Sequence, residues 1–123
     1  MVNKPKIQGT RFETGTVNLL KSWGYKAYRL AEGGLKDEGD VQVEIQNNKL
    51  PITEVIFECK ARQNLNIHQT YFKAKQKAGD KPLVLAWKKL VNKGSNARRS
   101  PDGVPTLYII DEDLLKDLLE NYG

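Results

Sequence analysis

The stretch that decides the fold runs from Gly39 to Lys60, GDVQVEIQNNKLPITEVIFECK. Its first part, residues 40–45, alternates polar and apolar side chains, which is typical of a strand with one buried face. Its last part, residues 52–60, is rich in Ile, Val and Phe and predicts a more deeply buried strand. Residues 46–49 between them predict a turn, so the whole stretch is expected to form a β-hairpin.

The segments on either side of this hairpin show helical and strand patterns in turn. We expect three helices. The first spans residues 10–23, the second runs from an N-cap at Asn66 to a stop at Gly79, and the third spans residues 111–122. We expect further strands at residues 25–31, 83–87 and 106–110. Loops are expected at residues 32–39, which contain three glycines, and at residues 88–105, which lack periodicity. The order αβββαββα indicates the α/β (α+β) class.

Length and composition narrow the class of protein. A chain of 123 residues with 39% hydrophobic and 28% charged side chains is expected to form one soluble domain over residues 1–123. No apolar run approaches the roughly 20 residues of a membrane span, and no export signal is recognisable, so we expect an intracellular, cytoplasmic protein without membrane contact. One cysteine and one histidine exclude an intramolecular disulfide and a closed Cys/His zinc site.

Charge is unevenly distributed along the chain. Residues 60–99 carry eleven basic and one acidic side chains, whereas residues 100–123 carry one basic and six acidic. Such a basic block predicts a surface for a polyanion, most simply a nucleic-acid backbone, although a solvated face is the alternative. The expected DNA contacts are Arg62, Lys73, Lys77, Lys88, Lys89, Lys93, Arg98 and Arg99.

The candidate catalytic and metal-binding residues lie in this hairpin. A turn centred between Asn48 and Lys49 places Asp40 opposite, or within one residue of, Glu58. Period two puts Lys60 on the same face as Glu58. Adjacent carboxylates repel each other unless a cation offsets the repulsion, and oxygen ligands suit Mg²⁺ or Mn²⁺. Lys60 could then hold a water and stabilise charge on a phosphoryl oxygen. The alternative is a salt-bridged sheet surface.

The GDV at residues 39–41 and the ECK at residues 58–60 carry a family resemblance. The chain resembles the PD-(D/E)XK nuclease superfamily, in particular the archaeal-type Holliday junction resolvases, small homodimeric enzymes also found in phages. The resemblance covers nearly the whole chain, from Glu13 to the fourth strand. It implies a restriction-endonuclease-like αβββαβ core, with a mixed central sheet flanked by helices.

This resemblance also implies site residues. It assigns Asp40 and Glu58 as metal ligands and Lys60 as the catalytic lysine, with Mg²⁺ as cofactor and Mn²⁺ as a substitute. Glu13 matches the acidic residue that the family places on its first helix. Gln69 resembles a glutamine near the family's site, and Gln76 is an alternative. Gly39 stands where the family often has proline, which changes the loop but removes no ligand.

Several of these and neighbouring residues have a purely structural interpretation. Glu13 stands three residues after Thr10, the spacing of a helix-capping box, so it is expected to cap the helix, to assist the metal, or both. The remaining side chains are expected to serve packing or the surface: Cys59 as a small buried hydrophobe, His68 on the surface, and Trp23, Trp87, Leu114, Leu115, Leu118 and Leu119 in the core.

The resemblance implies a metal-dependent, structure-selective DNA endonuclease. Its substrate would be branched DNA, a four-way (Holliday) junction, resolved by paired symmetric nicks through phosphodiester hydrolysis. A junction with near two-fold symmetry suits a homodimer with two identical sites. The alternatives are another PD-(D/E)XK nuclease of restriction-like or repair type, and a non-catalytic DNA-binding module.

Overall fold

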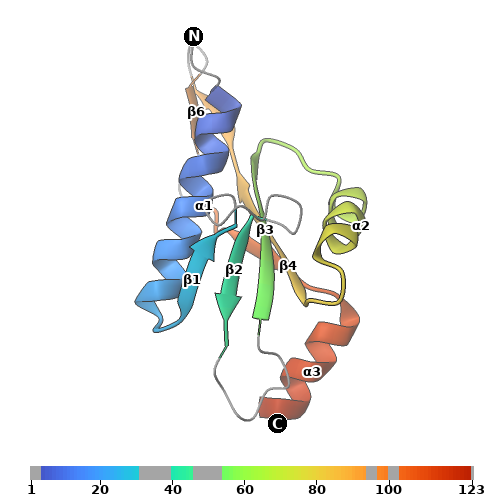
Figure 1. Ribbon diagram of the computed structural model, residues 1–123. Helices are drawn as coiled ribbons and strands as arrows, with labels where there is room; N and C mark the ends of the chain where they lie inside the picture. Colours follow the sequence, from blue (N-terminus) through green and yellow to red (C-terminus); the bar gives the residue numbers. More distant parts are fainter. Residues whose placement is uncertain (1–3, 31–39, 46–53, 94–96, 100–102, 123) are drawn as a thin grey trace.

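The computed structural model describes residues 4–30, 40–45, 54–93, 97–99 and 103–122. In this part of the chain, a five-stranded mixed sheet of order β1-β2-β3-β4-β7 lies between helices (Figure 1). Strands β3 and β4 are parallel, and the other neighbours are antiparallel. The elements are α1 (Lys4–Ser22), β1 (Lys26–Arg29), β2 (Val41–Glu44), β3 (Glu54–Arg62), α2 (Ile67–Ala78), β4 (Leu83–Lys89), β5 (Val91–Lys93), β6 (Ala97–Arg99), β7 (Leu107–Ile109) and α3 (Glu112–Tyr122).

The predicted pairing of β2 with β3 is confirmed. Val41 lies opposite Phe57, so the next residues along the two strands are Asp40 and Glu58. The backbone of Asp40 is held on both sides, since its N–H donates to the carbonyl of Phe57 and its carbonyl accepts from Leu30. Asp40 therefore extends the sheet by one residue beyond β2.

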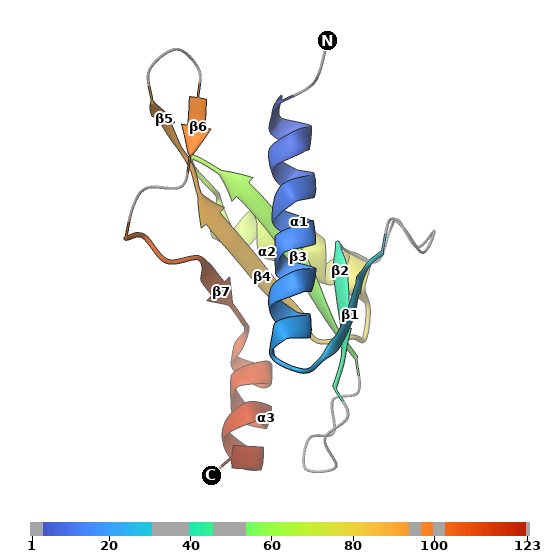
Figure 2. The same ribbon diagram turned by 90° about the vertical axis from the view of Figure 1, so that its left-hand side faces the viewer.

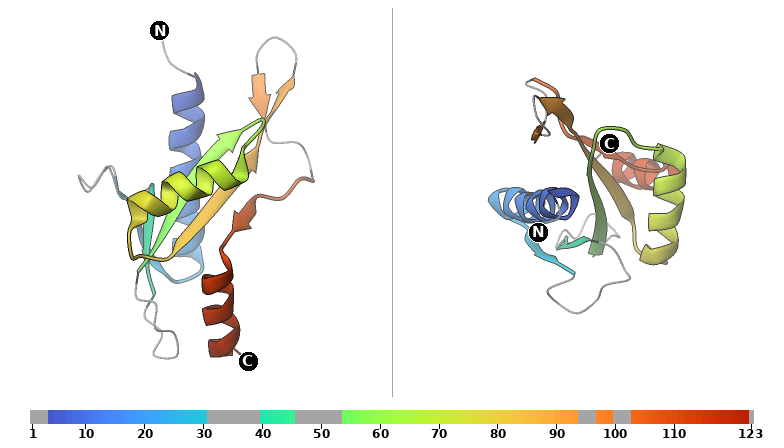
Figure 3. Two further views of the ribbon diagram at one scale, coloured as in Figure 1. Left: turned by 90° about the vertical axis from the view of Figure 1, so that its right-hand side faces the viewer. Right: turned by 90° about the horizontal axis from the view of Figure 1, so that it is seen from above.

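Alternation along β3 separates two apolar clusters. Val55, Phe57 and Cys59 pack with buried residues of α1 and α3 on one face of the sheet. Ile56 packs with Ala74 and Ala78 of α2 on the other face. Figures 2 and 3 show α1 and α2 on opposite sides of the sheet. The face that Glu58 shares with Ile56 is thus the face covered by α2, as the period-two pattern predicts.

Both predicted ends of α2 are confirmed. The side chain of Asn66 accepts a hydrogen bond of 3.1 Å from the N–H of Gln69 and caps the helix. Gly79 ends the helix with a φ of 64°, a value that glycine adopts without steric cost, and its N–H donates to the carbonyl of Lys75. These caps fix where α2 begins and ends, and Ala74 and Ala78 are its buried residues.

Several expectations about the ends of the helices and about the core differ from the structure. α1 begins at Lys4, six residues before the expected start, and ends before Trp23, whose side chain is 60% exposed. Leu114 is buried but Leu115 and Leu119 are exposed, because α3 has the sheet on one side only and residues one position apart point about 100° apart on a helix. Trp87 is half-buried, and its indole N–H donates to the carbonyl of Arg62.

The expected basic loop at residues 88–105 is partly β-structure. Lys88 and Lys89 extend β4, and β5 pairs with β6 in an antiparallel hairpin that projects beyond the sheet (Figures 1 and 2). The sequence pattern did not predict this hairpin because each strand has only three residues, too few for an alternation to be recognised. The other expected loop, residues 32–39, and the turn at residues 46–49 lie outside the described residues. No helix in the described ranges combines the length and apolar character needed to cross a bilayer.

Candidate functional site

Asp40 is fixed against the third strand through its side chain. Its Oδ2 accepts a hydrogen bond of 2.7 Å from the backbone N–H of Cys59, the residue between Glu58 and Lys60. Burial raises the pKa of Asp40 to about 6, and the nearby charge of Glu58 acts in the same direction, while the Cys59 N–H lowers it. Asp40 and Glu58 are therefore close enough to interact electrostatically, as the register of the strands requires.

Glu58 is the most enclosed carboxylate of the site. Only 3% of its surface is exposed, and its Oε1 lies 3.5 Å from Nζ of Lys60 and 3.8 Å from Nζ of Lys77. Its Oε2 is buried without a hydrogen-bond partner among the described residues. A buried charged oxygen without a partner is costly, and coordination of a cation removes that cost.

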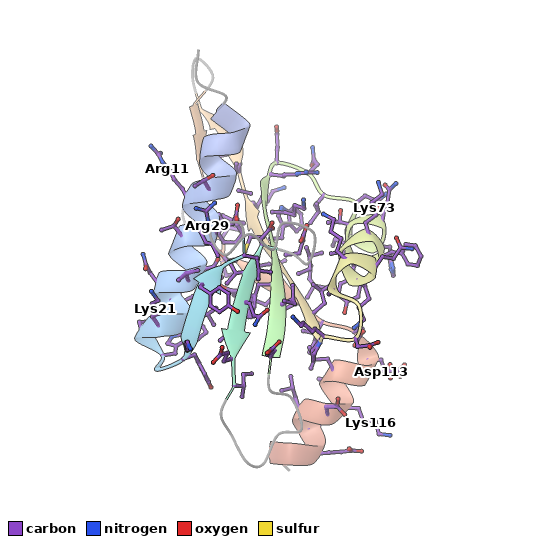
Figure 4. All side chains as sticks on the ribbon, viewed as in Figure 1. Arg11, Lys21, Arg29, Lys73, Asp113 and Lys116 are labelled. Atoms are coloured by element: carbon purple, nitrogen blue, oxygen red, sulfur yellow. The ribbon has the colours of Figure 1, made fainter. Side chains whose placement is uncertain are left out.

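Glu13 approaches the same end of the sheet from α1. Its Oε1 lies 3.5 Å from Nε of Arg29 on β1, whose position on the sheet is labelled in Figure 4. Burial raises the pKa of Glu13 and the Arg29 guanidinium opposes this rise, with smaller effects from Glu58 and Lys60. The capping-box interpretation is wrong because α1 runs through Thr10, which leaves Glu13 in the middle of the helix. We refer to Glu13, Asp40 and Glu58 as the acidic cluster.

Lys77 of α2 contacts the acidic cluster, although the sequence indicated it only as a DNA contact. Gln69 and Gln76 are both exposed, and Gln69 contributes its backbone N–H to the helix cap. His68 is exposed, as expected. The sequence contains one signal for the contact between Lys77 and the sheet. Lys77 stands between Ala74 and Ala78, and small residues let a helix approach a sheet closely.

Cys59 is a packing residue, as predicted. It is 6% exposed within the cluster of α1 and α3, and its Sγ lies 3.7 Å from Oγ1 of Thr16. Burial raises the pKa of its thiol far above the usual range, which keeps it protonated and unreactive. Its contribution to the site is its backbone N–H.

The donor set at this site is oxygen and not sulfur or imidazole. Among the described residues, no three Asp, Glu, His or Cys side chains are grouped closely enough to hold an ion by themselves. Asp40 and Glu58 therefore offer a pair of carboxylates, while Glu13 is engaged by Arg29. Such a pair fits Mg²⁺, which commonly uses one or two carboxylates and fills its other positions with water and phosphate oxygens.

Basic residues lie at the same end of the sheet as the acidic cluster. The parallel register places Arg62 beside Lys89 at the ends of β3 and β4, just beyond Lys60. Nζ of Lys89 donates to the carbonyl of Gln63 and lies 5.5 Å from the centre of the Trp87 ring. Lys88 is half-buried in β4, and Lys73 is exposed on α2 (Figure 4). The backbones of Lys93, Arg98 and Arg99 form the β5–β6 hairpin, and their side chains lie outside the description.

Comparisons of the chain with protein-family models, curated proteins and solved structures found no match.

Proposed function

We propose that this protein is a metal-dependent, structure-selective DNA endonuclease that resolves four-way junctions. The observation that carries the proposal is the arrangement around Glu58. This buried carboxylate has one oxygen beside Lys60 and another with no hydrogen-bond partner in the described part of the chain, and Asp40 is held next to it by a backbone hydrogen bond. A salt-bridged sheet surface would not need to bury such a group at the basic end of the sheet.

The residues present fit a divalent cation. Asp40 and Glu58 would hold Mg²⁺ or Mn²⁺, and Glu13 lies close enough to respond electrostatically to both carboxylates and to Lys60. When bound, Mg²⁺ supplies Lewis-acid stabilisation of the negative charge that grows on the phosphoryl oxygens. Lys60 donates hydrogen bonds from its ammonium group and stabilises the same charge or orients the attacking water.

The order of the elements supports the nuclease class. The segment from α1 to β4 follows the order αβββαβ, with a mixed sheet, and its acidic cluster and lysine come from α1, β3 and the residue before β2. We assign this segment to a restriction-endonuclease-like core. β5, β6, β7 and α3 extend it.

Basic side chains provide the DNA-binding part of the proposal. Arg62, Lys88 and Lys89 lie beyond the acidic cluster, and the β5–β6 hairpin follows directly from β4. Phosphate contacts from these residues would orient the DNA backbone across the site. A homodimer with two-fold symmetry would present two such sites and nick opposed strands of a junction.

The experiment compares a synthetic four-way junction with a linear duplex made of the same arm sequences, each with Mg²⁺ or with EDTA. We expect paired nicks in the junction with Mg²⁺, little cutting of the duplex, and no cutting with EDTA. Equal cutting of both substrates would favour a restriction-like or repair nuclease. Tight binding without metal-dependent cutting would identify a DNA-binding module. Light scattering of the purified protein tests the homodimer.

A further inference from the structure

The resemblance of the chain to nucleases accounts for one lysine at the site, yet the structure has two. Nζ of Lys60 and Nζ of Lys77 approach the same oxygen of Glu58, at 3.5 and 3.8 Å. Lys60 comes from β3 and Lys77 from the last turn of α2, so two separate elements deliver cations to one carboxylate. The other oxygen of Glu58 has no hydrogen-bond partner among the described residues.

The two lysines differ in how freely they can move. The side chain of Lys60 is 23% exposed, and that of Lys77 is 51% exposed. A half-exposed lysine on a flexible stem exchanges partners at little cost, whereas a more enclosed one keeps its position. Lys77 is therefore the cation that can leave Glu58 when another positive charge arrives.

A divalent cation bound by Asp40 and Glu58 would repel both ammonium groups. A phosphodiester entering the site would bring negative charge to the same place. The ammonium group of Lys77 would then move from the Glu58 carboxylate to a phosphate oxygen. The charge-assisted hydrogen bond formed there would lower the free energy of the complex.

We propose that Lys77 is a second cationic residue of the active site. It neutralises Glu58 while the site is empty, and it contacts the phosphate to be cut once DNA and cation are bound. This inference rests on the proposed nuclease function, and it adds to that function a phosphate-binding residue supplied by α2 instead of the sheet.

The test uses three variants of the full-length protein. Lys77→Met removes the charge and keeps the length of the side chain, and Lys77→Arg keeps the charge. Lys116→Met is the matched control, because Lys116 is a 72% exposed lysine of α3 whose Nζ lies 3.8 Å from Glu120 of the same helix (Figure 4). Thermal melting of each variant checks folding, which a half-exposed side chain is not expected to control.

The first measurement is independent of cutting. Mn²⁺ affinity is measured by calorimetric titration without DNA. Removing a positive charge near the carboxylates should make Lys77→Met bind Mn²⁺ about tenfold more tightly than the wild type, by the Coulomb interaction of nearby charges. Lys77→Arg and Lys116→Met should bind as the wild type does. Equal affinity of Lys77→Met and the wild type would overturn the proposed neutralising role.

The second measurement is single-turnover cutting of the four-way junction at saturating protein with Mg²⁺. We expect Lys77→Met to cut about 10- to 100-fold more slowly, since a stabilising charge is lost from the transition state. Lys77→Arg should recover most of the rate. If the wild type and Lys77→Met cut equally fast at saturation, Lys77 is not an active-site residue. If the wild type itself does not cut, the nuclease function fails instead, and the Mn²⁺ titration still decides whether Lys77 neutralises the site.

Discussion

The backbone N–H of Cys59 donates a hydrogen bond of 2.7 Å to Oδ2 of Asp40. This bond joins the residue before β2 to the residue of β3 that lies between Glu58 and Lys60. The geometry of the acidic cluster therefore depends on main-chain atoms, which the identity of the Cys59 side chain does not change. A rigid carboxylate pair of this kind is costly when both groups are ionised, and that cost leads to measurable consequences.

Asp40→Asn is expected to make the metal-free protein more stable at pH 7.5. Burial and the charge of Glu58 raise the pKa of Asp40 to about 6, whereas an unfolded aspartate titrates near 4. Between these pH values the folded protein binds more protons, so its free energy of unfolding falls as the pH rises. Asparagine keeps an oxygen to accept from Cys59 and removes a charge whose cost is up to about 3 kcal/mol.

Urea denaturation in EDTA at pH 4.5 and pH 7.5 measures this effect. The difference in stability between Asp40→Asn and the wild type should be larger at pH 7.5 than at pH 4.5. Asp40→Ala is the control, because alanine removes the charge and the acceptor together and leaves the Cys59 N–H without its bond. An Asp40→Asn protein that is less stable than the wild type at pH 7.5 would contradict the prediction.

The pairing at the centre of this site could be predicted from sequence because strand alternation has a strict period of two. The pattern of residues 52–60 fixes which side chains share a face with Glu58, and the expected turn fixes Asp40 beside it. The structure has the same faces and the same neighbours, although β3 begins at Glu54 and ends at Arg62. The prediction that residues 40–45 bury only one face is wrong, because Gln42 on the other face is 3% exposed and donates a hydrogen bond from Nε2 to the hydroxyl of Tyr28.

The contact between Lys77 and Glu58 could not be predicted in the same way. It depends on how α2 is rotated and how closely it approaches the sheet, and this is decided by the packing of Ala74 and Ala78. α1 was missed over its first turns because its apolar stripe begins late, although Pro5 near its start was a usable signal. Leu115 and Leu119 continue an apolar pattern that nothing in the described structure covers.

Glu58→Gln should remove the stabilisation of the protein by Mn²⁺. A ligand at 100 times its dissociation constant stabilises a folded protein by about 2.7 kcal/mol, roughly 10 °C in Tm for a domain of this size. The wild type should show such a rise, while Glu58→Gln should show little. Glu54→Gln is the control, since Glu54 pairs with Lys81 and should leave the rise unchanged. Matching ionic strength with NaCl excludes general screening, and a wild-type Tm that ignores millimolar Mn²⁺ would contradict the metal site.

Lys60→Ala is expected to bind the junction but not to cut it. The side chain of Lys60 lies mostly enclosed beside Glu58. At this place its charge is expected to stabilise the reacting phosphate and to add little to the binding of more distant DNA phosphates. Binding is measured in EDTA and cutting at saturating protein with Mg²⁺. Weak binding together with normal cutting at saturation would make Lys60 a simple phosphate contact.

The thiol of Cys59 should be protected from Ellman's reagent in the native protein. The side chain is 6% exposed, and burial raises its pKa, so the reactive thiolate is scarce. The reaction should speed up with urea in parallel with unfolding followed by circular dichroism. Rapid reaction without urea would mean that α1 does not cover β3 as described.

Neutralising the β5–β6 hairpin should weaken DNA binding in a salt-dependent way. The hairpin follows the end of β4 at Lys89, which lies opposite Arg62, two residues beyond Lys60 on β3, and Arg98 and Arg99 are part of β6. Each lost phosphate contact lowers the slope of log affinity against log salt by roughly one unit, so the double variant Arg98→Gln, Arg99→Gln should lose about two units. Cutting at saturating protein should survive, because the acidic cluster is intact.

Lys116→Gln, which removes an exposed charge on α3, controls for net charge and should keep the full slope. An unchanged slope in the double variant would identify these arginines as solvated surface charges and would move the DNA path to the lysines of α2.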